Sequence, residues 1–266
     1  MALPLSALDR MPEPRHVVVG DDIRLATYAW GDPDAPVVVV VHGFASGTRD
    51  NWVLTGWVRM LEAAGYFVLG VDQRGHGLSD RPHEPEGYTV RTLATDLETV
   101  LDTYLIGHAH YVGYSLGARV GWEVARDLED RIPRAVLGGV PDGIPLARLD
   151  VDQVRAYIAD GVPVEDRTTQ SYIALTERVR GNDLRALLAL AEGMRTSGTI
   201  DPDAARAPRQ PVLFATGSQD AIIEGSRLLA SAAPQGRFFE IPDRHHFNAP
   251  GSRAFREAAL AFLAEG

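Results

Sequence analysis

Residues 37–41 are five valines in a row, within the stretch "APVVVVVHG". β-Branched side chains favour extended backbone, and a strand with one face in water alternates apolar and polar residues. This run does not alternate, so we expect a strand that is buried on both faces. Such strands are typical of a mainly parallel sheet with helices on both faces. The run therefore predicts an α/β fold.

Strand-like and helical stretches alternate along the rest of the chain. Helices are expected at about 51–64, 89–105 and 116–128, and they lead to the strand-like stretches "YFVLGVD", "AHYVGYS" and "RAVLGGV". Near the end come "PVLFATG", a helix near 224–233, "GRFFEIP" and a last helix from about Ser252. Strands that alternate with helices form βα units with right-handed crossovers, which supports a parallel sheet.

Two segments depart from this alternation. "RHVVV" and "IRLATYAWG" flank a turn at 20–22 and predict a hairpin. Between Val140 and Pro211 lie about seventy residues, more than a loop or one crossover helix needs. They contain helical patterns such as "RTTQSYIALTERVR" and no strand pattern. We therefore expect a core domain with a helical insertion over one end of the sheet, divided as 1–141 and 208–266 for the core and 142–207 for the insertion.

The composition excludes several classes of partner. The 266-residue chain has a formal net charge of -10, whereas binding to nucleic acid or to anionic membranes needs concentrated Lys and Arg. No apolar run approaches the ~20 residues that span a bilayer, and "MALPLSALDRMPEPR" lacks the features of a signal peptide. There is no cysteine, so disulfides and thiolate metal sites are excluded. We expect a cytoplasmic protein with a small-molecule partner; no oligomeric state is indicated.

A candidate nucleophile lies where a buried strand passes into a helix. Gly113-Tyr114-Ser115-Leu116-Gly117 is the only G-x-S-x-G in the chain, and it falls at that junction. The sharp turn strains the serine backbone, and flanking glycines let the helix and strand approach closely. A helix N-cap serine in a tight turn is the alternative interpretation. The context favours a nucleophilic Ser115.

With this elbow, the stretches "VVVHGFASGTRDNW" and "VLGVDQRGHGLSDRP" resemble members of the α/β-hydrolase fold superfamily. The similarity runs from about residue 15 to the end, and the two stretches are familiar signatures of single-domain members that resemble esterases, lactonases and cofactor-free haloperoxidases. The resemblance implies a mainly parallel sheet with helices on both faces and a helical cap, formed here by the insertion. It implies no cofactor.

The superfamily orders its catalytic triad as serine, acid and histidine along the chain. Asp220 follows the strand "PVLFATG", where the acid is usually found, and the carboxyl ends of parallel strands are where ligand groups gather. Asp142, just past "RAVLGGV", is a rival because some members place the acid there. A loop or helix-cap role for Asp220 is the plain alternative. The resemblance favours Asp220.

The base is expected in "DRHHF", which contains His245 and His246. Adjacent side chains point in different directions, so only one of them can serve Ser115. The resemblance favours His246, because the catalytic histidine is commonly followed by an aromatic residue or Met. A metal site is not expected, because no H-x-H or H-E-x-x-H pattern surrounds the pair.

The resemblance also implies an oxyanion hole made by two backbone N–H groups. These belong to Phe44, which follows His-Gly, and to Leu116, which follows the nucleophile. His42 and His76 are interpreted as structural histidines that hold this region. His108 and His110 are expected to be solvated.

Together these residues predict a serine hydrolase that cleaves a small ester, lactone or related acyl compound through an acyl-enzyme. A serine, where haloalkane dehalogenases and epoxide hydrolases carry aspartate, argues against those chemistries. C–C bond hydrolases and perhydrolases on the same triad, or a non-catalytic ligand-binding member, are the alternatives. Several apolar residues are candidates for binding substrate, although most of them are more readily explained as core residues: Trp52, Tyr88, Ile144, Tyr157, Tyr172 and Ile222.

Overall fold

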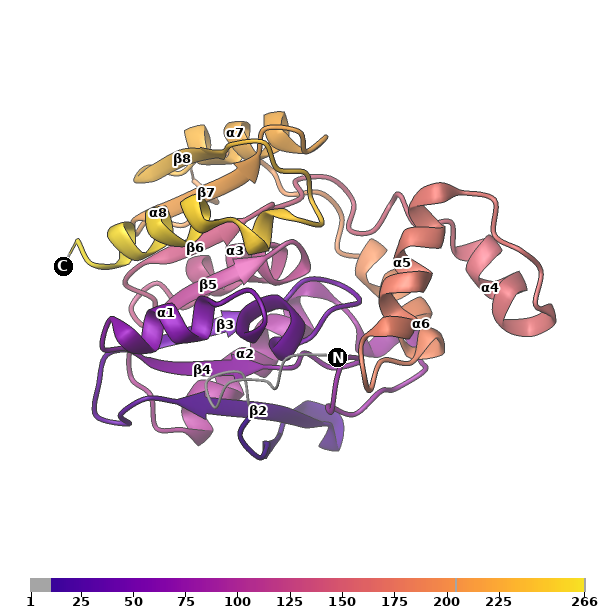
Figure 1. Cartoon of the computed structure of the whole chain (residues 1–266), viewed down its shortest axis with the longest axis horizontal. Coiled ribbons are helices and arrows are strands. Elements are labelled where there is room, and N and C mark those ends of the chain that lie inside the picture. Colours follow the sequence, from indigo (N-terminus) through magenta and orange to yellow (C-terminus); the bar gives the residue numbers. More distant parts are fainter. Residues whose placement is uncertain (1–10, 204, 266) are drawn as a thin grey trace, which may run out of the picture.

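The computed structural model describes residues 11–203 and 205–265, which form an eight-stranded sheet with helices on both faces (Figure 1). The strand order across the sheet is β1-β2-β4-β3-β5-β6-β7-β8. β2 runs antiparallel to both of its neighbours, and the remaining adjacent pairs are parallel. The strands are β1 (Arg15–Val18), β2 (Arg24–Trp30), β3 (Val37–Val41), β4 (Phe67–Val71), β5 (His110–Tyr114), β6 (Ala135–Gly138), β7 (Val212–Gly217) and β8 (Gly236–Ile241).

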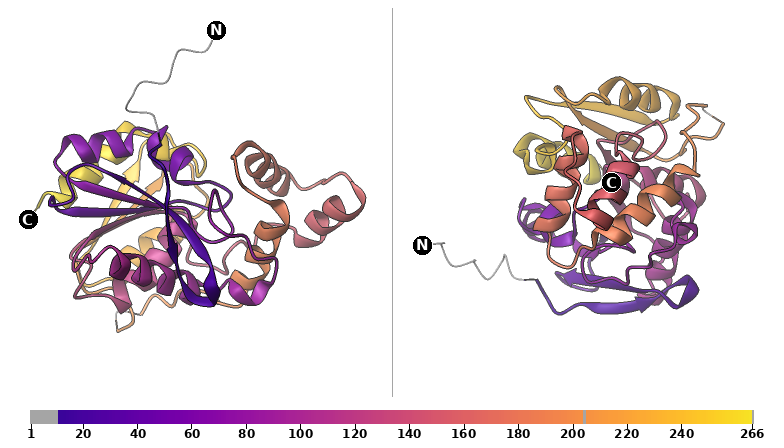
Figure 2. Two further views of the ribbon diagram at one scale, coloured as in Figure 1. Left: turned by 90° about the horizontal axis from the view of Figure 1, so that it is seen from below. Right: turned by 90° about the vertical axis from the view of Figure 1, so that its right-hand side faces the viewer.

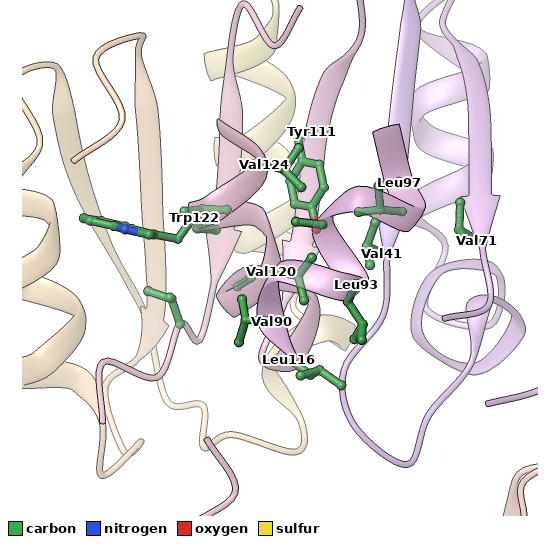
Figure 3. Close-up of a cluster of buried hydrophobic side chains, with 14 of the residues drawn as sticks. Val41, Val71, Val90, Leu93, Leu97, Tyr111, Leu116, Val120, Trp122 and Val124 are labelled. Atoms are coloured by element: carbon green, nitrogen blue, oxygen red, sulfur yellow. The ribbon is translucent and has the colours of Figure 1, made fainter. Parts of the chain in front are cut away.

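The five valines lie in the middle of this sheet, and their prediction is confirmed. Val38 and Val40 belong to one buried apolar cluster, whereas Val39 and Val41 belong to the other, and all four are at most 2% exposed. Figure 3 shows part of the cluster that contains Val39 and Val41, with Val41 beside Leu93 and Leu97 of the helix α2 (Val90–Thr103). The predicted hairpin is also confirmed, because β1 pairs antiparallel with β2.

Five helices of the core cover the two faces of the sheet (Figure 1). α1 and α8 pack on one face, and α2, α3 and α7 pack on the other. The expected helix at 51–64 is divided into a π-helical turn at Arg49–Val53 and the helix α1. Gly56 separates them, because it takes a left-handed conformation (φ 84°). The bounds are α1 (Trp57–Ala63), α2 (Val90–Thr103), α3 (Leu116–Asp127), α7 (Ile223–Ala232) and α8 (Arg253–Leu263).

The interval between β6 and β7 contains three helices and, among its described residues, no strand. They are α4 (Val151–Asp160), α5 (Arg167–Arg178) and α6 (Leu184–Arg195), each with an aspartate that caps its first turn. Figures 1 and 2 show them projecting from one end of the sheet, with α4 farthest from the core. We call these three helices and their connections the cap.

Two expectations concern the ends of the chain and the membrane. The N-terminal stretch without signal-peptide features begins in residues 1–10, which lie outside the described residues. No helix within the described ranges combines the length and apolar character that a bilayer crossing requires.

Candidate active site

Ser115 occupies a strained turn between β5 and α3. Its backbone has φ 51° and ψ -110°, and its hydroxyl does not cap the helix that follows. A Cβ atom added to Gly113 would lie 2.4 Å from the Gly117 carbonyl oxygen, and one added to Gly117 would lie 2.1 Å from that of Val41. Both glycines are therefore required for the close approach of helix and strand, as predicted. Ser115 stands at the N-cap position of α3, but its side chain makes no capping hydrogen bond.

The structure brings Ser115, His246 and Asp220 into one hydrogen-bonded row. The Ser115 hydroxyl lies 2.8 Å from His246 Nε2, and His246 Nδ1 lies 2.7 Å from Asp220 Oδ2. With Nδ1–H donating to the carboxylate, Nε2 is free to accept the serine proton. The Asp220 side chain is 3% exposed and that of His246 is 21% exposed, so the acid lies beneath the base and the base faces the cavity.

Close backbone contacts join the loops that carry the acid and the base. A Cβ atom on Gly217 would lie 2.1 Å from the Arg244 carbonyl oxygen, and the Gln219 N–H donates to that same oxygen at 2.9 Å. The Tyr114 hydroxyl donates to the His246 carbonyl oxygen at 2.5 Å. Burial raises the pKa of Tyr114 well above its ordinary value, which keeps the hydroxyl a donor. Tyr114 is a supporting residue that the sequence reasoning missed.

The two rival residues are not part of this row. His245 is exposed, and its ring nitrogen Nδ1 accepts from the Phe247 N–H at 3.3 Å. Asp142 lies against α7, where a Cβ atom on Gly225 would be 2.4 Å from its carboxylate. His246 and Asp220, not His245 and Asp142, are therefore the residues that meet Ser115.

The turn at residues 43–46, which we call the oxyanion turn, lies directly against the serine. A Cβ atom on Gly43 would be 3.2 Å from Ser115 Cβ. The Phe44 N–H has no hydrogen-bond acceptor among the described residues, and Leu116 opens α3, where an N–H has no acceptor within the helix. The two predicted oxyanion donors are thus both available beside the nucleophile.

Two buried histidines hold this turn, as predicted. His42 Nδ1 donates to the Gly43 carbonyl at 2.8 Å, and its Nε2 accepts from the Gln73 N–H at 3.1 Å. His76 Nε2 accepts from the Ala45 N–H at 3.1 Å. Burial lowers the pKa of both imidazoles, that of His76 well below its usual range. Neutral rings can therefore accept these backbone N–H groups.

The other histidines include one wrong expectation. His108 is exposed, but His110 begins β5 and is half-buried, with its ring centroid 6.0 Å from that of Tyr66. β5 places the His110 ring partly inside the structure. The sequence does not indicate this burial, because the residue stands at the start of the strand. Among the described residues, no three His, Asp or Glu side chains are grouped as metal ligands.

Ser115 opens into a cavity of about 690 Å³ between the core and the cap. α5 contributes one face to it, including Tyr172, Leu175 and Arg178. The Tyr172 ring lies between those of Phe44 and Phe247, with centroids 5.3 and 5.7 Å away. An aromatic wall from the oxyanion turn, the cap and the histidine loop therefore borders the nucleophile.

Four of the residues predicted to bind substrate do not line this cavity. Trp52 is 0% exposed and packs edge-on against Trp57, and Tyr88 is equally buried, with its hydroxyl donating to the Pro82 carbonyl at 2.6 Å. Both are core residues, because their side chains point into the packed interior. Ile144 is 48% exposed, and Ile222 donates its backbone N–H to Asp220 Oδ1 at 3.3 Å.

Comparisons with known proteins agree with this architecture. A family model described as alpha/beta hydrolase fold matches residues 36–163. The chain is 32% identical over 188 residues to rhodomycin D methylesterase of Streptomyces sp. (strain C5), covering 68% of this chain and 61% of that protein. It is 35% identical over 138 residues to epoxide hydrolase A of Mycobacterium tuberculosis (strain ATCC 25618 / H37Rv), covering 51% and 40%. The enol-lactonase of Burkholderia xenovorans LB400 matches with a TM-score of 0.78 at 23% identity, covering 94% of this chain and 100% of that structure.

The two curated matches cover less than two thirds of those proteins' own lengths, and the enol-lactonase is similar in fold. The family model runs from just before β3 to just beyond α4 of the cap, and it includes the elbow and the oxyanion turn. The strand order, the parallel core of the sheet and the helices on both faces agree with it. The chain has the α/β-hydrolase fold, and a family model of that fold matches its residues 36–163.

Proposed function

We propose that this chain is a serine hydrolase that cleaves a small carboxylic ester or lactone through an acyl-enzyme. The observation that carries the proposal is the row from Ser115 through His246 to Asp220, with hydrogen bonds of 2.8 and 2.7 Å. This row ends beside the backbone N–H groups of Phe44 and Leu116, for which the described part of the chain provides no acceptor, and acyl transfer requires such an arrangement.

In the first half of the reaction, His246 Nε2 takes the proton of the Ser115 hydroxyl as Oγ attacks the acyl carbonyl carbon. The negative charge that develops on the carbonyl oxygen is held by the N–H groups of Phe44 and Leu116. Asp220 stabilises the imidazolium through Nδ1–H. The imidazolium then protonates the leaving alkoxide, and the carbon–oxygen bond to the alcohol breaks. The acyl group remains on Ser115 as an ester.

In the second half, His246 takes a proton from water, and the resulting hydroxide equivalent attacks the acyl carbon. The same two N–H groups hold the second oxyanion. As the intermediate collapses, the imidazolium returns its proton to Ser115 Oγ, and the carboxylic acid leaves. For a lactone, the alcohol and the acid are two ends of one product.

The relatives support acyl chemistry in this fold without naming a substrate for this chain. Two of them are named as a methylesterase and an enol-lactonase. The epoxide hydrolase relative suggests another reaction, but opening an epoxide through a covalent intermediate needs a nucleophile whose alkyl adduct water can hydrolyse. A carboxylate forms such an ester, whereas Ser115 would form a stable ether. This chemistry favours the acyl substrate.

The proposal is tested with a fluorophosphonate probe and a panel of p-nitrophenyl esters and lactones of graded acyl size. We expect the probe to label Ser115 in the folded protein, and Ser115→Ala and His246→Ala to abolish turnover of any hydrolysed ester. His245→Ala is the matched control and is expected to keep wild-type rates. An unreactive Ser115 would contradict the proposal and favour the ligand-binding alternative. Turnover that survives Ser115→Ala would also contradict it, because Ser115 would then not be the nucleophile.

A further inference from the structure

We propose that Asn182, a residue of the cap, is a positioning residue that holds the oxyanion turn in its working geometry. The inference rests on the function proposed above, because it concerns how the oxyanion donors of that reaction are oriented. Asn182 belongs to the connection between α5 and α6, and it is not among the residues that line the catalytic cavity.

The Asn182 side chain bridges two loops of the core. Its Nδ2 donates to the Ala45 carbonyl oxygen at 3.0 Å, and its Oδ1 accepts from the Gly77 N–H at 2.9 Å. Each half of the amide therefore has a partner of the matching kind, which fixes the orientation of the group. One of the two partners is the residue directly after the oxyanion donor Phe44.

The oxyanion turn needs such external support. Ala45 is completely buried and has φ 58°, a left-handed conformation that a residue with a Cβ atom rarely adopts. Four side chains hold the backbone groups of the turn on either side of Phe44. Asn51 accepts from the Gly43 N–H at 3.1 Å, and His42 donates to the Gly43 carbonyl. His76 accepts from the Ala45 N–H, and Asn182 donates to the Ala45 carbonyl. The first three come from the core, and Asn182 is the contribution of the cap.

The connection that carries Asn182 is in direct backbone contact with the core. Gly181 has φ +92°, and a Cβ atom there would lie 2.2 Å from the Gly77 carbonyl oxygen. The Arg81 guanidinium donates to the carbonyls of both Gly77 and Gly181, which clamps the two segments together. The position of Asn182 therefore follows from how the cap is docked, and so does its bond to Ala45.

This arrangement has a consequence for the reaction. The direction of the Phe44 N–H depends on the conformation of the turn, and a released Ala45 carbonyl would let the turn relax out of its strained state. The donor would then point less well at the oxyanion, whose charge develops only in the transition state. Loss of the Asn182 bond should lower kcat and leave KM almost unchanged.

Asn182→Asp tests the inference, because one carboxylate oxygen can still accept from the Gly77 N–H while the other faces the Ala45 carbonyl oxygen. His83→Ala is the matched control. It removes the neighbouring contact between core and cap, His83 Nε2 to Asp183 Oδ2 at 2.8 Å, without touching the oxyanion turn. Asn182→Ser, whose hydroxyl is too short to bridge both partners, serves as a second variant should the aspartate variant not fold.

We expect a fall in kcat of about tenfold for the Asn182 variants, as for loss of one hydrogen bond, with KM within about twofold. An alkylboronic acid, which forms a tetrahedral adduct on serine, should bind the variants more weakly by the same factor. His83→Ala should keep wild-type kcat. Wild-type kcat in a folded Asn182 variant, or an equal loss in His83→Ala, would overturn the inference. A wild-type protein whose Ser115 resists fluorophosphonate would overturn the proposed function itself, and this inference with it.

Discussion

The core and the cap meet at the same cavity, but they contribute to it in different ways. The core supplies the reacting groups from loops at the carboxyl ends of strands, and close backbone contacts at Gly113, Gly117 and Gly217 determine where those loops lie. The cap supplies Tyr172, from the face of α5 that borders the cavity, and Asn182, from the connection after α5, which contacts the oxyanion turn and does not line the cavity. The proposed chemistry therefore belongs to the core, and the cap shapes the space for substrate and contacts the oxyanion turn.

The largest expected effect lies in the core. Asp220→Asn should lower kcat by about 10⁴-fold, because an amide cannot stabilise the imidazolium and favours the wrong tautomer of His246. Asp142→Asn is the control and should have little effect, since Asp142 lies against α7. Steady-state rates on the best ester of the panel measure both. A severe loss for Asp142→Asn with a mild one for Asp220→Asn would reverse the assignment of the acid.

A pair of aromatic substitutions separates packing in the core from substrate contact in the cap. Trp52→Ala should lower the free energy of unfolding by about 3–5 kcal/mol, because it leaves a cavity in a closed interior. Tyr172→Ala should raise KM by about tenfold with a smaller loss of stability, because its ring lines the cavity. Urea unfolding and ester kinetics measure the two effects. A higher KM for Trp52→Ala in folded protein would contradict this and indicate that Trp52 contacts the substrate.

The smallest effect is a dependence of stability on pH that arises beneath the oxyanion turn. Burial lowers the pKa of His42 and His76 below 6.5 in the folded protein. As the pH falls below 6.5, the unfolded chain takes up protons that the folded protein does not, so the free energy of unfolding should decrease. Each group contributes up to about 1.4 kcal/mol per pH unit.

His76→Gln tests this, because a glutamine oxygen can still accept from the Ala45 N–H but does not titrate. Urea unfolding at pH 7.5 and 5.5 should show a weaker pH dependence in this variant than in the wild type. An equal dependence in the two proteins would mean that the buried imidazole is not its source.

The difference between the core and the cap also explains what could be predicted from the sequence. The burial of residues 37–41 on both faces and the elbow at Ser115 follow from local patterns. The exposure of a strand and the geometry of a tight turn each determine which residue types stand at adjacent positions. Asp220 and His246 could be placed because parallel strands end at the same edge of the sheet, and the resemblance decided between neighbouring candidates. Each of these residues is tied to a strand end.

The contacts of the cap could not be predicted in this way. Asn182 meets Gly77 and Ala45 across 105 and 137 residues of chain, and that contact depends on how the helical cap docks on the α/β core. Trp52 is a candidate for the pocket from its sequence position because a large apolar side chain near the elbow suits both a core and a binding site. Only the packing of its neighbours distinguishes the two.

The most direct test of the central claim is mass spectrometry of the protein after rapid acid quench during hydrolysis of an activated ester such as p-nitrophenyl acetate. The account predicts a single acyl adduct, mapped by peptide digestion to Ser115, which disappears as substrate is exhausted and is absent from Ser115→Ala. Ester consumption without an adduct, or an adduct on another residue whose removal stops turnover, would contradict it.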